Sequence, residues 1–324
     1  MRRRPGTAAV LALVAALAVA GCDRTGEDRP NASATIALDA RPAAVDAGLE
    51  LMLVRDFDGA EGVELRLQAR TARTTALERL ISRRAQFAVL DIHDLARARE
   101  RGRDVVGVMA LVQRPLAAVV AGRAVRRPRD LEGRRVGVSA ARADAAVLAA
   151  IVRHDGGAAG RVRRVRITRG VAASAVESGR VAAAVGRWDT DGVALLAERP
   201  GAHAFRADDY GAPAYPELVL CVTRETLRDS RPVVRATVAA IRRGYQEALV
   251  DPESAVGALV DRTRGLDRTF EQASFDAVQP AFLEGVTRFG DLVPGRLRAW
   301  ARWEAAEGVT KRPPDVGRAF ALGF

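Results

Sequence analysis

Residues 87–116 read FAVLDIHDLARARERGRDVVGVMALVQRPL. Phe87–Leu90 is a short apolar run typical of a buried strand. Ile92–Arg101 has a helical pattern that ends before Gly102, and Val105–Val112 is apolar again. A strand, a helix and a second strand in close succession indicate an α/β fold with mostly parallel sheets.

The same alternation extends to both sides of this stretch. We expect earlier strands at Thr35–Leu38 and Val63–Leu67, and later strands at Leu116–Ala121, Arg135–Val138, Arg163–Thr168, Val181–Val185 and His203–Arg206. From Leu227 onward the pattern is almost wholly helical. Two α/β sets predict a clamp of two lobes with a ligand between them, where loops at the carboxyl ends of strands converge.

The lobes are expected to interleave along the chain. The predicted divisions are a signal peptide at 1–21, a flexible tether at 22–33, the first lobe at 34–121 and 215–324, and the second lobe at 122–214. The two crossings are expected near Ala121–Arg129 and Gly211–Leu218, with the C-terminal helices packed on the first lobe.

The amino terminus indicates export. Arg2–Arg4 form a positive segment, and the apolar run Ala8–Ala20 is too short to span a bilayer, which takes about 20 residues. The run ends in Val19-Ala20-Gly21-Cys22, which resembles the lipobox of bacterial lipoproteins. We therefore expect an extracytoplasmic protein anchored to the membrane by lipidated Cys22. The alternative is an ordinary secretory signal with an incidental cysteine.

Composition argues against a nucleic-acid partner. The chain has 51 basic and 40 acidic residues, a formal net charge of +11. Only Lys311 is a lysine, and the arginines are interleaved with acids rather than gathered on an aromatic-studded stripe. The second cysteine, Cys221, lies in an apolar run and is expected to be a small buried hydrophobe, with no disulfide.

Three stretches carry a resemblance to a known family. They are residues 87–116, the segment Arg129–Val138 (RDLEGRRVGV) and the segment Asp208–Leu220 (DDYGAPAYPELVL). The chain resembles the receptors for thiamine pyrimidine precursors, which are similar to the sulfonate, nitrate and taurine receptors. The resemblance implies a periplasmic-binding-protein type II fold and a role as the substrate-binding lipoprotein of an ABC importer.

Several positions depart from that family. Where relatives carry a stacking aromatic, an asparagine and a histidine after the first strand, this chain has Ala40, Ala43 and Asp46. A fungal relative is a pyrimidine synthase that consumes its own histidine at the position of Asp46, so the resemblance does not imply that chemistry here. Import is therefore better supported than a pyrimidine cargo.

The predicted ligand-binding residues lie at strand ends. They are Asp39, Asp46, Ser139, Arg187, Trp188, Asp189, Asp191 and Tyr215. Trp188 would stack on a flat ligand, or else pack in the core or between the lobes. The aspartates would accept hydrogen bonds from an amine or cap helices, and Arg169 or Arg187 would recruit an anion or form a salt bridge. His93 is interpreted as a structural polar residue.

No enzyme signature emerges from the chain. It has three histidines without metal-ligand spacing, and no GxSxG, P-loop or GxGxxG motif. We expect no catalytic residue, metal or cofactor. The leading hypothesis is a monomeric receptor for a pyrimidine-like or amine-bearing molecule, working with ABC permease subunits. The alternatives are a receptor for an anion such as an alkanesulfonate, and a surface sensor or interaction protein with a degenerate cleft.

Overall fold

The computed structural model describes residues 31–71 and 73–324. The expected signal peptide and Cys22 lie outside the described residues. β1 (Ala32–Leu38) begins inside the segment expected to be a tether, and Ala32 pairs with Val63 of β2 (Val63–Gln68). The first lobe therefore begins earlier than expected, because Ala32 and Ser33 extend the parallel ladder.

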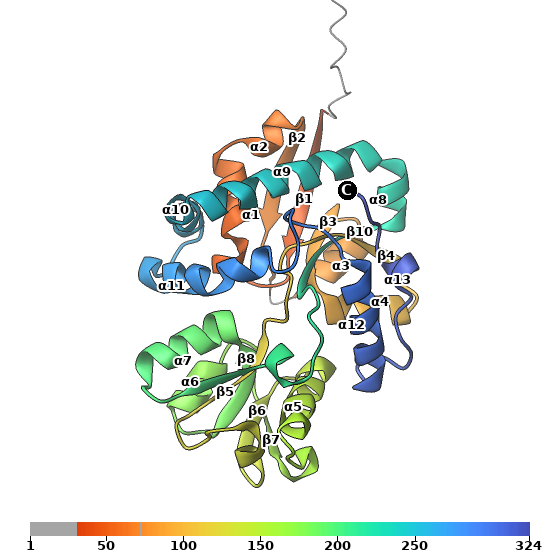
Figure 1. Cartoon of the computed structure of the whole chain (residues 1–324). Helices are drawn as coiled ribbons and strands as arrows, with labels where there is room; N and C mark the ends of the chain where they lie inside the picture. The colour runs from red at the N-terminus through yellow and green to blue at the C-terminus, as the bar shows by residue number, and fades with distance from the viewer. Residues whose placement is uncertain (1–30, 72) are drawn as a thin grey trace, which may run out of the picture.

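Two five-stranded sheets form two lobes (Figure 1). The first sheet has the order β2-β1-β3-β10-β4, with β3 at Phe87–Asp91, β4 at Val105–Ala110 and β10 at Leu218–Thr223. The second has the order β7-β6-β8-β5-β9, with β5 at Ala117–Ala121, β6 at Arg135–Val138, β7 at Arg163–Arg166, β8 at Ala183–Arg187 and β9 at His203–Arg206. The bilobal α/β fold expected from the sequence is confirmed.

The first crossing between the lobes differs from the expected one. β5 pairs antiparallel with β8 and β9, so residues 117–121 belong to the second lobe rather than to the first. The chain crosses between β4 and β5, at residues 111–116, and not at Ala121–Arg129. It returns between η5 (Asp208–Tyr210) and β10. The sequence of an apolar strand does not show which sheet the strand joins, which explains why the boundary between the lobes was misplaced.

Helices cover both sheets. The first lobe carries α1 (Ala47–Val54), α2 (Phe57–Ala60), α3 (Ala76–Ile81) and α4 (Ile92–Glu100), and the second carries α5 (Arg142–His154), α6 (Ala172–Glu177) and α7 (Val193–Glu198). The C-terminal helices α8 (Arg224–Asp229), α9 (Arg231–Val250), α10 (Pro252–Arg262), α11 (Arg268–Val278), α12 (Pro294–Ala306) and α13 (Val316–Ala319) follow. α9 and α10 pack on α1, and α13 packs on β4 and α4, so this part returns to the first lobe as expected.

A close helix crossing fixes α9 on α1. A Cβ on Gly244 would lie 2.3 Å from the carbonyl oxygen of Gly48 and 2.6 Å from Cβ of Met52. Nearby, the Tyr245 hydroxyl donates a hydrogen bond to the Val45 carbonyl at 2.8 Å. This packing holds the turn after β1, which borders the space between the lobes. Within residues 31–71 and 73–324, no helix is long and apolar enough to cross a bilayer.

Candidate functional site

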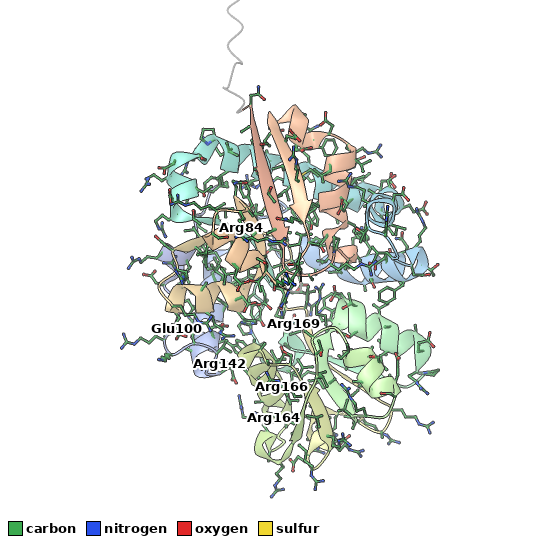
Figure 2. The ribbon with its side chains drawn as sticks, turned by 180° about the vertical axis from the view of Figure 1, so that it is seen from behind. Arg84, Glu100, Arg142, Arg164, Arg166 and Arg169 are labelled. Carbon is green, nitrogen blue, oxygen red and sulfur yellow. The ribbon has the colours of Figure 1, made fainter. Side chains whose placement is uncertain are left out.

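A cavity of about 290 Å³ lies between the lobes, next to both crossings. The first lobe contributes the turn after β1 and the end of β3, and the second lobe contributes the loop after β7 and the end of β8. Both lobes thus bring the carboxyl ends of parallel strands to one space, where ligands bind in such sheets. In Figure 2, Arg169 is labelled between the lobes, whereas Arg164 and Arg166 of β7 lie on the second lobe.

Four of the eight predicted residues line this cavity: Asp39, Asp46, Arg187 and Asp191. The other four, Ser139, Trp188, Asp189 and Tyr215, do not line it. Sequence reasoning did not select Asp91 and Glu217, which complete the lining beside the crossings. Arg41, Asp144 and Arg169 also line the cavity, and the sequence analysis names Arg169 as a residue that would recruit an anion or form a salt bridge.

The carboxylates of the cavity are held in place by backbone N–H groups. Asp46 accepts from Ala43 at 3.1 Å, and Glu217 accepts from Leu116 at 3.0 Å. In the same way Asp39 accepts from Ala76 at 3.3 Å, Asp144 from Ser139 at 3.1 Å and Asp91 from His93 at 2.8 Å. Each of these five bonds uses one oxygen, so the carboxylates are oriented while their other oxygens stay available.

Arg187 is already bound by a carboxylate of its own lobe. Its Nε donates to Oδ1 of Asp189 at 2.9 Å, and its Nη2 pairs with Oδ2 of the same residue. Asp189 is fully buried. Asp191 accepts from the backbone N–H groups of Arg187 at 3.0 Å and Ala173 at 3.3 Å, which orders the turn after β8. Asp189 therefore acts by holding Arg187 in position.

Trp188 packs in the core rather than at the cavity. Its side chain is 3% exposed, and its indole N–H donates to the Pro115 carbonyl at 2.8 Å. The Arg206 guanidinium lies 4.2 Å from the centre of the ring. These contacts favour packing between the first crossing and the second sheet over stacking on a ligand.

Tyr215 belongs to a buried network behind the cavity. Its hydroxyl lies 3.1 Å from Nε2 of His93, whose Nδ1 lies 2.6 Å from Oε2 of Glu304 on α12. All three side chains are at most 3% exposed. The charges of Glu304 and Asp91 outweigh the opposing effect of burial and raise the pKa of His93 to about 10. A charged imidazolium thus offsets the acidic residues around it.

Asp91, His93 and Glu217 are the described residues nearest to a metal-ligand set, with ligand atoms within 4.8 Å of one another. Both ring nitrogens of His93 are, however, engaged by Glu304 and Tyr215. A metal would have to displace one of these contacts, so we assign no metal to this group.

Burial dominates the titration of the cavity acids. It raises the pKa of Asp46 and the pKa of Glu217 to about 7 each. The Arg187 guanidinium opposes the rise at both carboxyls, and the charge of Asp91 adds to the rise at Glu217. The pKa of Asp39 and the pKa of Asp191 are also raised by burial. The empty cavity therefore holds carboxyl groups that are costly to ionise.

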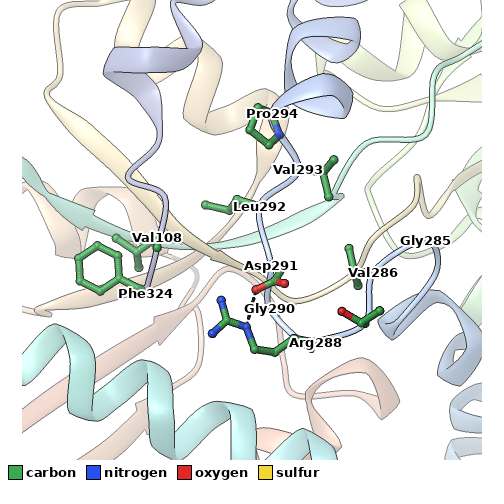
Figure 3. A pocket seen from close by; sticks show the side chains of 12 residues that line it. Val108, Gly285, Val286, Arg288, Gly290, Asp291, Leu292, Val293, Pro294 and Phe324 are labelled. Carbon is green, nitrogen blue, oxygen red and sulfur yellow. Dashed lines mark hydrogen bonds and ion pairs between the residues drawn. The ribbon is translucent and has the colours of Figure 1, made fainter.

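A larger hollow of about 660 Å³ is lined only by the first lobe (Figure 3). It lies against Val108, the loop 285–294 and the C-terminal Phe324, with Arg288 donating to Asp291 at 2.8 Å. No residue of the second lobe reaches it among those described. The interlobe cavity is therefore the candidate site.

Comparisons with known proteins identify the family of the chain. A family model described as NMT1/THI5 like matches residues 55–255. The formylaminopyrimidine-binding protein of Halalkalibacterium halodurans is 27% identical over 272 residues, which cover 82% of this chain and 80% of that protein. The resemblance read from the sequence is confirmed.

Solved structures share the fold. The periplasmic aliphatic sulphonate binding protein SsuA from Escherichia coli has a TM-score of 0.73 at 14% identity, covering 91% of this chain and 93% of that one. The desulfurization enzyme DSZB has a TM-score of 0.61 at 16% identity, covering 89% and 96%. This likeness extends to binding proteins and to an enzyme, so it shows the architecture alone.

Replacing Trp188 with alanine is expected to lower the free energy of unfolding by about 3–5 kcal/mol, because a buried aromatic is lost and leaves a cavity. Trp188→Phe keeps most of the packing and loses the hydrogen bond to Pro115, so its effect is expected to be smaller. Urea denaturation followed by circular dichroism measures both. Unchanged stability of Trp188→Ala would contradict the packing role.

The ligand-free protein is expected to lose stability as the pH rises from 5 to 8. The pKa values of Asp46 and Glu217 are about 7 in the fold, against roughly 4 for unperturbed carboxyls. Such groups stabilise the fold below their unfolded pKa, and this contribution is lost as the pH rises through about 7. Urea denaturation across this range measures the slope of the free energy of unfolding against pH. The double variant Asp46→Asn, Glu217→Gln should flatten it, and an unchanged slope would refute the assignment.

Proposed function

Because this chain belongs to the NMT1/THI5-like family, we propose that it is the solute-binding component of an ABC importer. It captures a small molecule in the interlobe cavity and presents it to permease subunits. The observation that carries the proposal is the cavity itself, whose polar lining comes from both lobes at the two crossings. A ligand that contacts both lobes favours the closed arrangement over the open one.

Binding rather than catalysis fits the lining. Among the described residues that line the cavity there is no serine, cysteine, histidine, tyrosine or lysine. Its acids are oriented by backbone N–H groups, as recognition requires, and the one hydroxyl among these residues, that of Thr190, has no histidine or lysine beside it in the lining to act as a base. We therefore propose that the protein is not an enzyme.

The charges of the cavity disfavour the anion alternative. Six carboxylates line it, namely Asp39, Asp46, Asp91, Asp144, Asp191 and Glu217, against the three arginines Arg41, Arg169 and Arg187. Arg187 is already paired with Asp189. An alkanesulfonate would meet an excess of negative charge, so an amine-bearing ligand suits the site better.

Binding of a formylaminopyrimidine tests this function. At a free concentration of 100 times Kd, it should add roughly 2.7 kcal/mol to the free energy of unfolding, because it binds only the native state. Thermal denaturation measures this gain, and small-angle scattering should show a smaller radius of gyration as the lobes close. Ethanesulfonate is the control ligand and should change neither. A gain with ethanesulfonate alone would favour the anion receptor instead, and recovery of a partner protein with no stabilising small molecule would favour the interaction protein.

We also propose that Cys22 carries the lipid anchor and holds the protein outside the cytoplasm. Cys22→Ser should abolish incorporation of a tagged fatty acid and release the protein from the membrane fraction, because the acceptor thiol is gone. Cys221→Ser is the matched control. It removes the other cysteine, which is fully buried, and leaves Cys22 in place, so the label should be kept. Labelling of the Cys22→Ser chain would disprove the anchor.

A further inference from the structure

Two carboxylates meet where the first sheet borders the cavity. Asp91 ends β3 and Glu217 precedes β10, and these strands are paired, with Leu218 opposite Asp91. The backbone N–H of Ile92 donates to the Glu217 carbonyl at 2.9 Å, which fixes the two strand ends together. Ligand atoms of Asp91 and Glu217 lie within 4.8 Å of each other, and both residues line the cavity.

Each of these carboxylates has an oxygen to spare. Asp91 uses Oδ1 to accept from the His93 N–H, and Glu217 uses Oε2 to accept from the Leu116 N–H. Within the described part of the chain, their other oxygens have no hydrogen-bond partner. Glu217 is 7% exposed and lines the cavity, so its free oxygen is available to a ligand there.

The cations that face this pair are shared with other carboxylates. Arg169, in the loop after β7, acts on Asp91 but also on Asp144, Asp94 and Asp39. His93 faces the pair from α4 but is already paired with Glu304, and Arg187 faces it from β8 but is already paired with Asp189. Asp46, also 7% exposed, is a third carboxylate whose charge, like that of Glu217, raises the pKa of Arg187. One cation brought by a ligand would supply the missing positive charge and the missing N–H donors.

We propose that the cleft takes a small organic cation of the amine or amidine class, whose N–H groups are shared between Asp91 and Glu217. This inference rests on the proposed function, since it names the ligand class of the same site. The two adjacent N–H groups of an amidinium match two acceptors at this spacing, and an anion would meet like charges there.

Three probes with the same ring and different charge test the ligand class. Benzamidinium should bind at least tenfold more tightly than the neutral benzamide in isothermal titration calorimetry at pH 7.5. Benzenesulfonate should not bind. Equal or tighter binding of benzamide or benzenesulfonate, or no binding of benzamidinium, overturns the proposal.

Isosteric variants test the residues. Glu217→Gln and Asp91→Asn keep an oxygen for the Leu116 and His93 N–H groups but remove the charge, and each should weaken benzamidinium binding at least tenfold. Glu253→Gln is the control on exposed α10 surface and should leave the affinity unchanged. Wild-type affinity in both cleft variants would overturn the assignment of the pair.

Proton release gives an independent readout. Burial and Asp91 raise the pKa of Glu217 to about 7, with His93 and Arg187 opposing the rise. A bound cation stabilises the ionised form, so binding near pH 7 should release protons and strengthen toward pH 8. Titrations in buffers of different ionisation enthalpy count these protons. Proton uptake would indicate a neutral ligand accepting from a protonated Glu217, and would overturn the proposal.

The outcomes distinguish a failure of this inference from a failure of the proposed function. Stabilisation by a formylaminopyrimidine without binding of benzamidinium would keep the receptor function and reject the cation class. Charge-dependent binding of benzamidinium, without lobe closure by any ligand, would keep the cation site and reject the transport role.

Discussion

The hydrogen bond from the Leu116 backbone to the Glu217 carboxylate joins the two crossings of the chain. Leu116 ends the passage from β4 to β5, and Glu217 ends the passage back to β10. Beside it, the backbone N–H of Leu111 donates to the Leu218 carbonyl at 2.8 Å. The backbone N–H of Trp188 donates to the Leu116 carbonyl at 3.0 Å. Glu217 thus both links the two connecting segments and lines the cavity, so a ligand that binds it would contact the segments that join the lobes.

The acidic side chains of the cleft are preorganised by the backbone. The cavity acids are oriented by main-chain donors at strand ends and helix starts rather than by other side chains. Burying these carboxyl groups makes them costly to ionise, as the raised pKa values of Asp46 and Glu217 indicate. The packed elements around the cleft, such as α9 on α1, compensate for that cost. Binding thus exploits an arrangement that is unfavourable while the cleft is empty.

Sequence reasoning found the residues whose positions follow from local structure. Asp39 follows β1 and Arg187 ends β8, while Asp46 and Asp191 lie in the turns beyond these strands, and strand ends point to the cleft in this fold. Trp188 and Asp189 are neighbours of Arg187 yet do not line the cavity, because the turn of π-helix after β8 rotates them inward. Glu217 escaped selection because its importance comes from the pairing of β10 with β3, a contact between distant parts of the chain. The misplaced boundary at β5 has the same cause, since partner choice is a tertiary property.

The position of β10 has a consequence for biogenesis. Residues 117–210 of the second lobe are contiguous, so this unit can condense as soon as it emerges from the ribosome or the export channel. The first sheet cannot, because β10 sits between β3 and β4 and comes after the whole of the second lobe. Until that late strand arrives, β3 and β4 present open edges that invite aggregation. The sheet whose first strands are made earliest is therefore the last to be completed.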